Sequence, residues 1–80
     1  MATIRPRAGG LLLPAVTDLG RELGPETVLG RVIHPQTFVE LEVIRTPYRR
    51  NVTILVHRTA DVVEPGSYGY MIGNLESALG

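Results

Sequence analysis

The chain has 80 residues, and its eight arginines balance eight acidic residues, so the formal net charge is zero. This length fits one domain with a small core, and the charge balance argues against a nucleic-acid-binding protein, which would carry a basic excess. The chain contains no cysteine and no lysine, which excludes disulfides, thiolate zinc sites, Schiff bases and any lysine-borne cofactor.

Proline and glycine divide the chain into short segments with strand-like composition. The expected strands cover residues 3–6, 10–16, 27–34, 37–45, 51–57 and 67–72. The segment from Thr17 to Gly24 holds two glycines and ends before Pro25, so at most one helical turn is expected there. Short strands at this spacing predict an all-β fold, a small sandwich or barrel. Residues 1–73 are expected to form this single domain, and 74–80 a frayed tail.

Two of the expected strands alternate between apolar and polar residues. In residues 37–45 the two glutamates are expected to face solvent, and the core face holds Val39, Leu41 and Val43. In residues 51–57 the expected core face holds Val52, Ile54 and Val56, with Thr53 and His57 on the other side. Both patterns predict half-buried strands.

The two halves of the chain resemble each other at an offset of 40 residues. The offset pairs Ile4 with Ile44, Arg5 with Arg45, Val16 with Val56 and Pro25 with Pro65. One added residue in the second half, Thr46, then aligns Pro6 with Pro47 and Gly10 with Asn51. Two similar halves that bury each other's apolar faces are expected, related by a pseudo-twofold axis. This arrangement resembles the barrel-sandwich hybrid fold of biotinyl and lipoyl domains.

In biotinyl and lipoyl domains a lysine on the central hairpin carries the cofactor. The corresponding hairpin here, residues 33–37, contains no lysine, which excludes the carrier function. A lysine-less, free-standing binding or assembly module without cofactor stays open as an alternative.

A more specific resemblance covers residues 7–73. Its motifs are Gly9-Gly10-Leu11, Val28-Leu29-Gly30-Arg31-Val32, Pro35, Thr46-Pro47 and the segment from Pro65 to Gly73. In this order and spacing they resemble the C-terminal β-domain of the succinylglutamate desuccinylase/aspartoacylase family. The chain departs from that family at Arg21 and Glu26, and also after Thr46-Pro47, where Asn51 is expected to accept a left-handed turn conformation.

The resemblance implies a non-catalytic accessory domain of a zinc-dependent N-acyl amino acid hydrolase, a desuccinylase- or deacetylase-type deacylase. The catalytic residues and zinc ligands would belong to a preceding catalytic domain of the same polypeptide, so no catalytic, metal or cofactor-attachment residue is assigned here. The domain would shape substrate access or assembly, including a homo-oligomer. The apolar runs are too short to span a membrane, and the N-terminal residues lack a signal peptide's apolar core, so a cytoplasmic protein without membrane or nucleic-acid partners is expected.

Five residues are candidates for the substrate channel or an interface: Tyr48, Arg49, Arg50, Tyr68 and Tyr70. The arginines, with Arg45, form either a patch that attracts carboxylates or a solvated turn paired with Glu40 or Glu42; the solvated turn is favoured. The two tyrosines alternate with Gly69 and are expected to share one face, either core or interface, with Tyr70 as the candidate for burial at an interface.

Two other motifs favour structural roles. His34 with Glu40 and Glu42 could be assembled into a metal site, but a turn histidine with exposed carboxylates is the favoured interpretation. Gly9-Gly10 precedes a strand rather than a helix, so a tight turn is expected instead of a phosphate loop.

Overall fold

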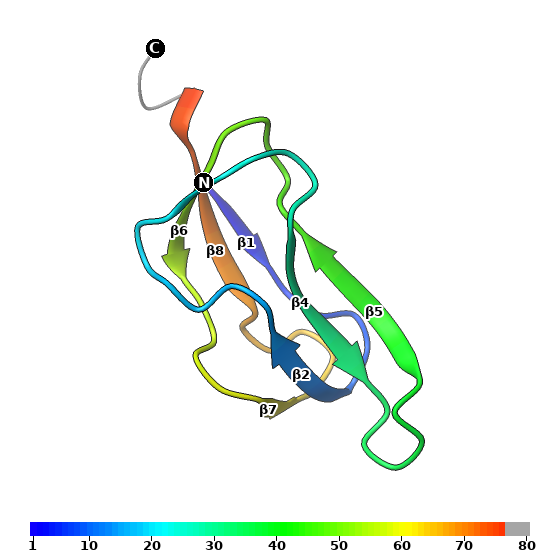
Figure 1. The fold of residues 1–80 in the computed structure, drawn as a ribbon. Helices are drawn as coiled ribbons and strands as arrows, with labels where there is room; N and C mark the ends of the chain where they lie inside the picture. Colours follow the sequence, from blue (N-terminus) through cyan, green and yellow to red (C-terminus); the bar gives the residue numbers. More distant parts are fainter. Residues whose placement is uncertain (77–80) are drawn as a thin grey trace.

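A computed structural model describes residues 1–76 and shows an all-β fold of eight strands in two antiparallel sheets, as the sequence predicts (Figure 1). The strands are β1 (Ala2–Ile4), β2 (Gly10–Pro14), β3 (Glu22–Leu23), β4 (Val28–Ile33), β5 (Glu40–Arg45), β6 (Asn51–Leu55), β7 (Asp61–Val63) and β8 (Tyr70–Asn74). One sheet has the strand order β1-β8-β6-β3, and the other has the order β5-β4-β2-β7.

The strand order repeats between the two halves of the chain. The strands β1, β8, β6 and β3 of the first sheet correspond, at an offset of about 40 residues, to β5, β4, β2 and β7. These four strands follow one another in the same order in the second sheet. The pairing register repeats as well, because Leu23 pairs with Asn51 in one sheet and Val63 pairs with Gly10 in the other. Each sheet therefore has two central strands from one half of the chain and two outer strands from the other half.

The core lies between the sheets and receives side chains from both halves. Its apolar members are Leu12, Val16, Leu23, Leu29, Val32, Ile44, Val63, Tyr70 and Ile72. Several of them occupy equivalent places in the two halves, such as Leu23 and Val63 beside the paired turns, or Val32 and Ile72 in the central strands. Apolar residues on both sides of the proline turns thus form a single shared core.

The inward face of β6 is polar, so the core face predicted for residues 51–57 is wrong at Ile54, whereas Val56, just after the strand, packs against the core as predicted. Thr53 is buried, and its hydroxyl donates to the carbonyl of Asp18 at 2.6 Å and accepts from the backbone N–H of Arg21 at 3.0 Å. Ile54 is exposed, and the register shifts between Thr53 and Leu55. The inward threonine is tolerated because its hydroxyl has both a donor and an acceptor partner, so its burial leaves no unpaired polar group.

The predicted face of β5 is wrong in the same way. Val39 and Leu41 are exposed, whereas Ile44 is buried and Glu42 is half-buried. The carboxylate of Glu42 accepts hydrogen bonds from the backbone N–H groups of Arg7 and Ala8, at 2.8 and 3.1 Å. This carboxylate holds the β1–β2 loop, which explains why a charged residue lies on the inner side of an edge strand.

Two short strands, β3 and β7, were not predicted. Each places one apolar side chain in the core, Leu23 or Val63, and a single buried residue leaves no periodic pattern in the sequence. The segment before Pro25 contains β3 instead of a helical turn. At the other end, the last strand begins at Tyr70 rather than at residue 67 and continues to Asn74, and residues 77–80 of the expected tail lie outside the described part.

Gly10 is required for close packing rather than for a turn conformation. A Cβ atom at this position would collide with the backbone carbonyl of Ile33 on the neighbouring strand. Neither Gly9 nor Gly10 has a positive φ, unlike Gly20 and Gly66. For Gly10, which is the first residue of β2, the expected tight turn is therefore wrong as the reason for the glycine.

Candidate functional site

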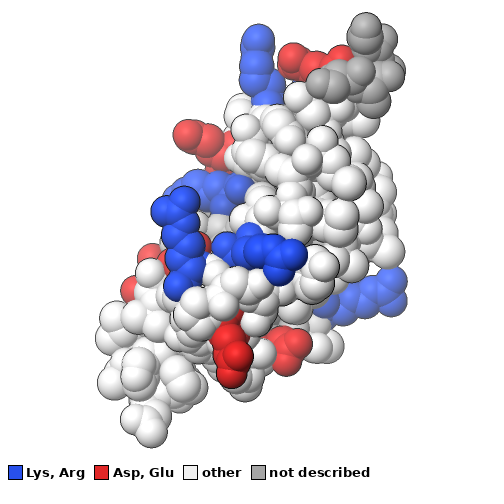
Figure 2. All heavy atoms as spheres, turned by 180° about the vertical axis from the view of Figure 1, so that it is seen from behind, with Lys and Arg blue, Asp and Glu red and all other residues white. Residues whose placement is uncertain are grey.

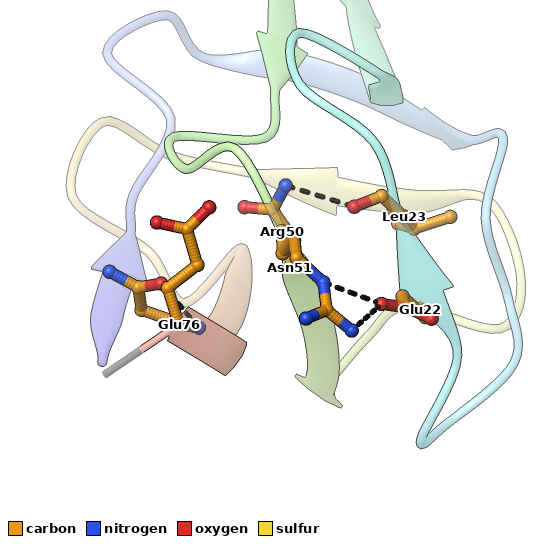
Figure 3. Close-up of polar contacts among 6 residues, drawn as sticks. Glu22, Leu23, Arg50, Asn51 and Glu76 are labelled. Carbon is orange, nitrogen blue, oxygen red and sulfur yellow. Dashed lines mark hydrogen bonds and ion pairs between the residues drawn. The ribbon is translucent and has the colours of Figure 1, made fainter. Parts of the chain in front are cut away.

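The loop between β5 and β6 carries three of the candidate residues, Tyr48, Arg49 and Arg50. Tyr48 is half-buried and packs against the core, whereas both arginines are exposed. Arg50 donates from Nε and Nη2 to the same carboxylate oxygen of Glu22, at 3.0 and 2.7 Å, across the β3–β6 pair (Figure 3). The expected pairing with Glu40 or Glu42 is wrong, because Glu40 lies beside Arg31 at 3.4 Å and Glu42 holds the β1–β2 loop.

Asn51 fixes this loop from inside the domain. Its side chain is fully buried, and Nδ2 donates to the carbonyl of Leu23 at 3.1 Å (Figure 3). The same Nδ2 also donates to the carbonyls of Gly24 and Tyr48, at 3.0 and 2.8 Å. Its Oδ1 accepts from the N–H of Tyr48 at 2.9 Å. Asn51 is the first residue of β6 and does not have a positive φ, so the expected left-handed turn conformation is wrong. The asparagine is present because its amide ties the β5–β6 loop to the turn after β3.

Tyr68 and Tyr70 have different environments and do not share a face. Tyr68 is exposed and precedes β8, and the guanidinium of Arg5 lies 4.4 Å above its ring centroid. Tyr70 is fully buried, and its hydroxyl donates to the carbonyl of Leu29 at 3.0 Å. Burial raises the pKa of Tyr70 to about 12. The expected burial of Tyr70 at an interface is wrong, because its side chain is already buried in the core of this domain.

The residues considered for a metal site are engaged separately. Nδ1 of His34 accepts from the backbone N–H groups of Gln36 and Thr37, at 3.2 and 3.3 Å, and Glu42 accepts from the β1–β2 loop. Within residues 1–76, no group of three His, Asp or Glu side chains could hold a metal ion. His34 is therefore a turn histidine that orders its own hairpin.

The β4–β5 hairpin presents an apolar surface that was not predicted. Phe38, Val39 and Leu41, here called the tip patch, are 69%, 57% and 44% exposed. This hairpin extends beyond the two sheets at one end of the molecule (Figure 1), and residues 33–39 contain no Arg, Asp or Glu. Strand alternation predicted that Val39 and Leu41 lie in the core. The signal that could have indicated an exposed apolar surface is the stretch around Phe38 without Arg, Asp or Glu.

The tip of this hairpin is held by its own hydrogen bonds. The N–H of His34 donates to the carbonyl of Val39, and the N–H of Phe38 donates to the carbonyl of His34, both at 2.8 Å. Phe38 has a φ of 60°, which is unfavourable for a residue with a Cβ atom by about 1–2 kcal/mol. The hairpin therefore holds an exposed aromatic side chain in one backbone conformation at a cost in free energy.

Within the described residues, no helix is long and apolar enough to cross a membrane. Comparison of the chain with protein-family models, with curated proteins and with solved structures yields no match. The functional interpretation therefore depends on the residues themselves and on the resemblance described above.

Proposed function

We propose that this chain is a non-catalytic accessory domain of a zinc-dependent N-acyl amino acid hydrolase, and that it docks on the preceding catalytic domain of the same polypeptide. The resemblance of residues 7–73 to the succinylglutamate desuccinylase/aspartoacylase family suggests the parent enzyme. The observation that carries the docking role is the tip patch, in which Phe38, Val39 and Leu41 are exposed on an ordered hairpin.

The chemistry of the tip patch fits an apolar recess on a protein surface. Burying a phenylalanine side chain contributes about 1.5–3 kcal/mol, and the hairpin has already adopted its conformation before docking. A contact of this size is weak between separate molecules. Within one polypeptide it suffices, because the linker keeps the local concentration of the second surface high.

In this proposal the zinc ligands and the catalytic residues belong to the catalytic domain. The β-domain contributes the docked hairpin and the Tyr48–Arg50 loop, which shape the route of the substrate or the assembly of the enzyme. The interlocked halves support this role, because strands from both halves surround one core and carry both features. A cytoplasmic enzyme is part of the same proposal.

The first test is the mass of the native protein that carries this segment, measured by immunoblot of a source-cell extract. The proposal expects a species several times larger than the 8.7 kDa of this chain. The larger polypeptide should then release a small carboxylate from an N-acyl amino acid, lose this activity with a chelator and regain it with zinc. Phe38→Ser in that polypeptide should loosen the docked domain, measured as faster cleavage of the interdomain segment by protease.

A native species of 8.7 kDa would overturn the proposal and favour the free-standing binding or assembly module. A larger polypeptide without zinc-dependent deacylation would overturn the assigned chemistry. Val62→Ser is the matched control for the docking step, because Val62 is 76% exposed on the short strand β7, away from the hairpin. Equal protease sensitivity of both variants would exclude the tip patch as the docking surface.

A further inference from the structure

A hollow of about 450 Å³ lies between β1 and β5, the outer strands at one edge of the two sheets. Its lining residues are Thr3, Ile4, Arg5, Arg7, Glu42, Val43, Ile44 and Arg45. Seen from behind, the molecule shows basic side chains gathered next to the lobe formed by the hairpin (Figure 2). The volume is within the range of small-molecule sites, about 300–1,000 Å³.

Two of the lining arginines occupy equivalent positions in the two halves. Arg5 donates from Nη1 to the carbonyl of Gly66 at 2.7 Å, and Arg45 donates from Nη1 to the carbonyl of Glu26 at 3.3 Å. Gly66 and Glu26 are themselves equivalent, and both have a positive φ. Each guanidinium donates through one nitrogen, and that of Arg5 also lies over the Tyr68 ring at 4.4 Å. Among residues 1–76 the other N–H groups of the two guanidinium groups have no hydrogen-bond partner, so they can donate to a ligand.

The charges that line the hollow do not cancel. Three arginines and one glutamate give a net charge of +2, and Glu42 accepts from the backbone N–H groups of Arg7 and Ala8 instead of from an arginine. Elsewhere in residues 1–76, Arg21, Arg31 and Arg50 each lie within 4 Å of a carboxylate. Over the same residues, the side chains of Arg5, Arg7 and Arg45 have no such carboxylate partner.

We propose that this hollow binds a small dianion, one anionic group on Arg5 and the other on Arg45, with Arg7 closing the site. Two arginines at equivalent positions, Arg5 directly after β1 and Arg45 at the end of β5, suit a ligand with negative charge at two points. Guanidinium groups donate paired hydrogen bonds to carboxylate and to phosphate oxygens, so both kinds of anion share this chemistry. The site uses only residues of this domain and does not depend on the proposed catalytic partner.

Calorimetry and NMR of the arginine Nε–H signals of the 80-residue chain test the proposal, with malonate, inorganic phosphate and acetate as probes at constant ionic strength. Malonate or phosphate should bind saturably in the millimolar range and shift the signals of Arg5, Arg7 and Arg45. Acetate should bind at least about tenfold more weakly, because it engages only one of the two groups. Malonate should bind more tightly than inorganic phosphate, whose charge lies at one centre, and tighter binding of phosphate would overturn the contact with two separate anionic groups.

Arg7→Gln is the decisive variant, because the Arg7 side chain has no hydrogen bond to another residue among 1–76, so the fold does not depend on it. It should lower the affinity for the dianion about tenfold, the value of one charge-assisted hydrogen bond. Arg58→Gln removes the same charge outside the hollow and should change the affinity less than about twofold. Equal losses in both variants, non-saturable shifts or equal binding of acetate would overturn the site without affecting the proposed enzyme role.

Discussion

Gly30 and Tyr70 occupy equivalent positions in the two halves, and the missing side chain of the first provides the space for the hydroxyl group of the second. Tyr70 pairs with Ile4 in one sheet as Gly30 pairs with Ile44 in the other. A Cβ atom on Gly30 would lie 2.5 Å from the hydroxyl oxygen of Tyr70. The two halves share their topology here, but their side chains are complementary rather than alike.

Gly30→Ala is expected to destabilise the fold by about 1–3 kcal/mol, because the added methyl group overpacks the contact with Tyr70 and lies 3.1 Å from the carbonyl of Leu13. Urea denaturation gives the free energy of unfolding. Gly24→Ala is the control, since its nearest atom is 4.0 Å away and its φ is not positive. Adding Tyr70→Phe to Gly30→Ala should recover part of the loss, and strict additivity would contradict the proposed clash.

The stability of the fold should fall above pH 10 because of Tyr70. Its pKa is about 12 in the folded state against an ordinary 10.0, so the unfolded state loses this proton first as the pH rises. Between these two values the free energy of unfolding should drop by about 1.4 kcal/mol per pH unit. The chain has no lysine whose titration would overlap this range. Denaturation curves of Tyr70→Phe should lack most of this alkaline slope, and an identical slope in that variant would contradict the assignment.

Asn51→Ala is expected to cost about 3 kcal/mol, because it leaves buried carbonyl groups and the N–H of Tyr48 without their partner. Asn51→Asp should be at least as damaging at neutral pH, since its carboxylate faces carbonyl oxygens, and should improve on acidification. Chemical denaturation at two pH values measures both. Asn74→Ala is the control, because among residues 1–76 the Oδ1 of Asn74 accepts only from the exposed N–H of Glu76. A loss of similar size there would mean that the Asn51 network has no special role.

Glu26→Gly should stabilise the fold by up to about 1 kcal/mol, because Glu26 has a φ of 52° that glycine adopts without strain. The equivalent turn already has a glycine, Gly66, with a φ of 85°. Gly66→Ala should therefore cost about 1 kcal/mol in the same denaturation assay. Changes of the same sign in the two variants would show that backbone strain does not govern these turns.

Arg49→Ala and Arg50→Ala test whether these two arginines contact the substrate or only stabilise the fold. In the larger polypeptide, the double variant should raise KM for a dicarboxylic N-acyl amino acid and leave kcat unchanged. Arg50→Ala alone should also lose up to about 1 kcal/mol of stability, because it breaks the ion pair with Glu22. Arg58→Ala serves as the control for lost positive charge. If KM stays unchanged in the double variant, these arginines do not contact the substrate.

The sequence predicted the fold class and the repeat, but it did not predict which side chains face the core. The proline turns and the offset of 40 residues can be recognised from the order of the residues, without knowledge of their contacts. By contrast, the inward placement of Asn51 and Thr53 depends on carbonyl and N–H groups about 30 residues away. A rule that buries apolar residues therefore assigned β6 to the wrong face, and the register shift after Thr53 reinforced the error.

The candidate site was predicted in part. The charges of Arg49 and Arg50 correctly predicted that their turn is exposed. The partner of Arg50 was not predicted, because Glu22 lies on β3, a strand of two residues that leaves no pattern in the sequence. The tip patch was missed because Val39 and Leu41 have the alternation of a buried strand. Only the three-dimensional arrangement shows that this strand begins at Glu40, beyond the edge of the core.

The exchange of strands between the two sheets has a consequence for the folding reaction. Because β7 pairs with β2, and β1 and β3 pair with β8 and β6, neither sheet is complete until segments far apart in the chain have met. Closing such long loops costs the chain conformational entropy before most native contacts are made. We therefore expect a folding time in the range of milliseconds to seconds, as for other β-sandwich and barrel domains. A polypeptide interrupted within residues 34–39 would assemble only as a bimolecular reaction, at a rate set by the concentration of the two pieces.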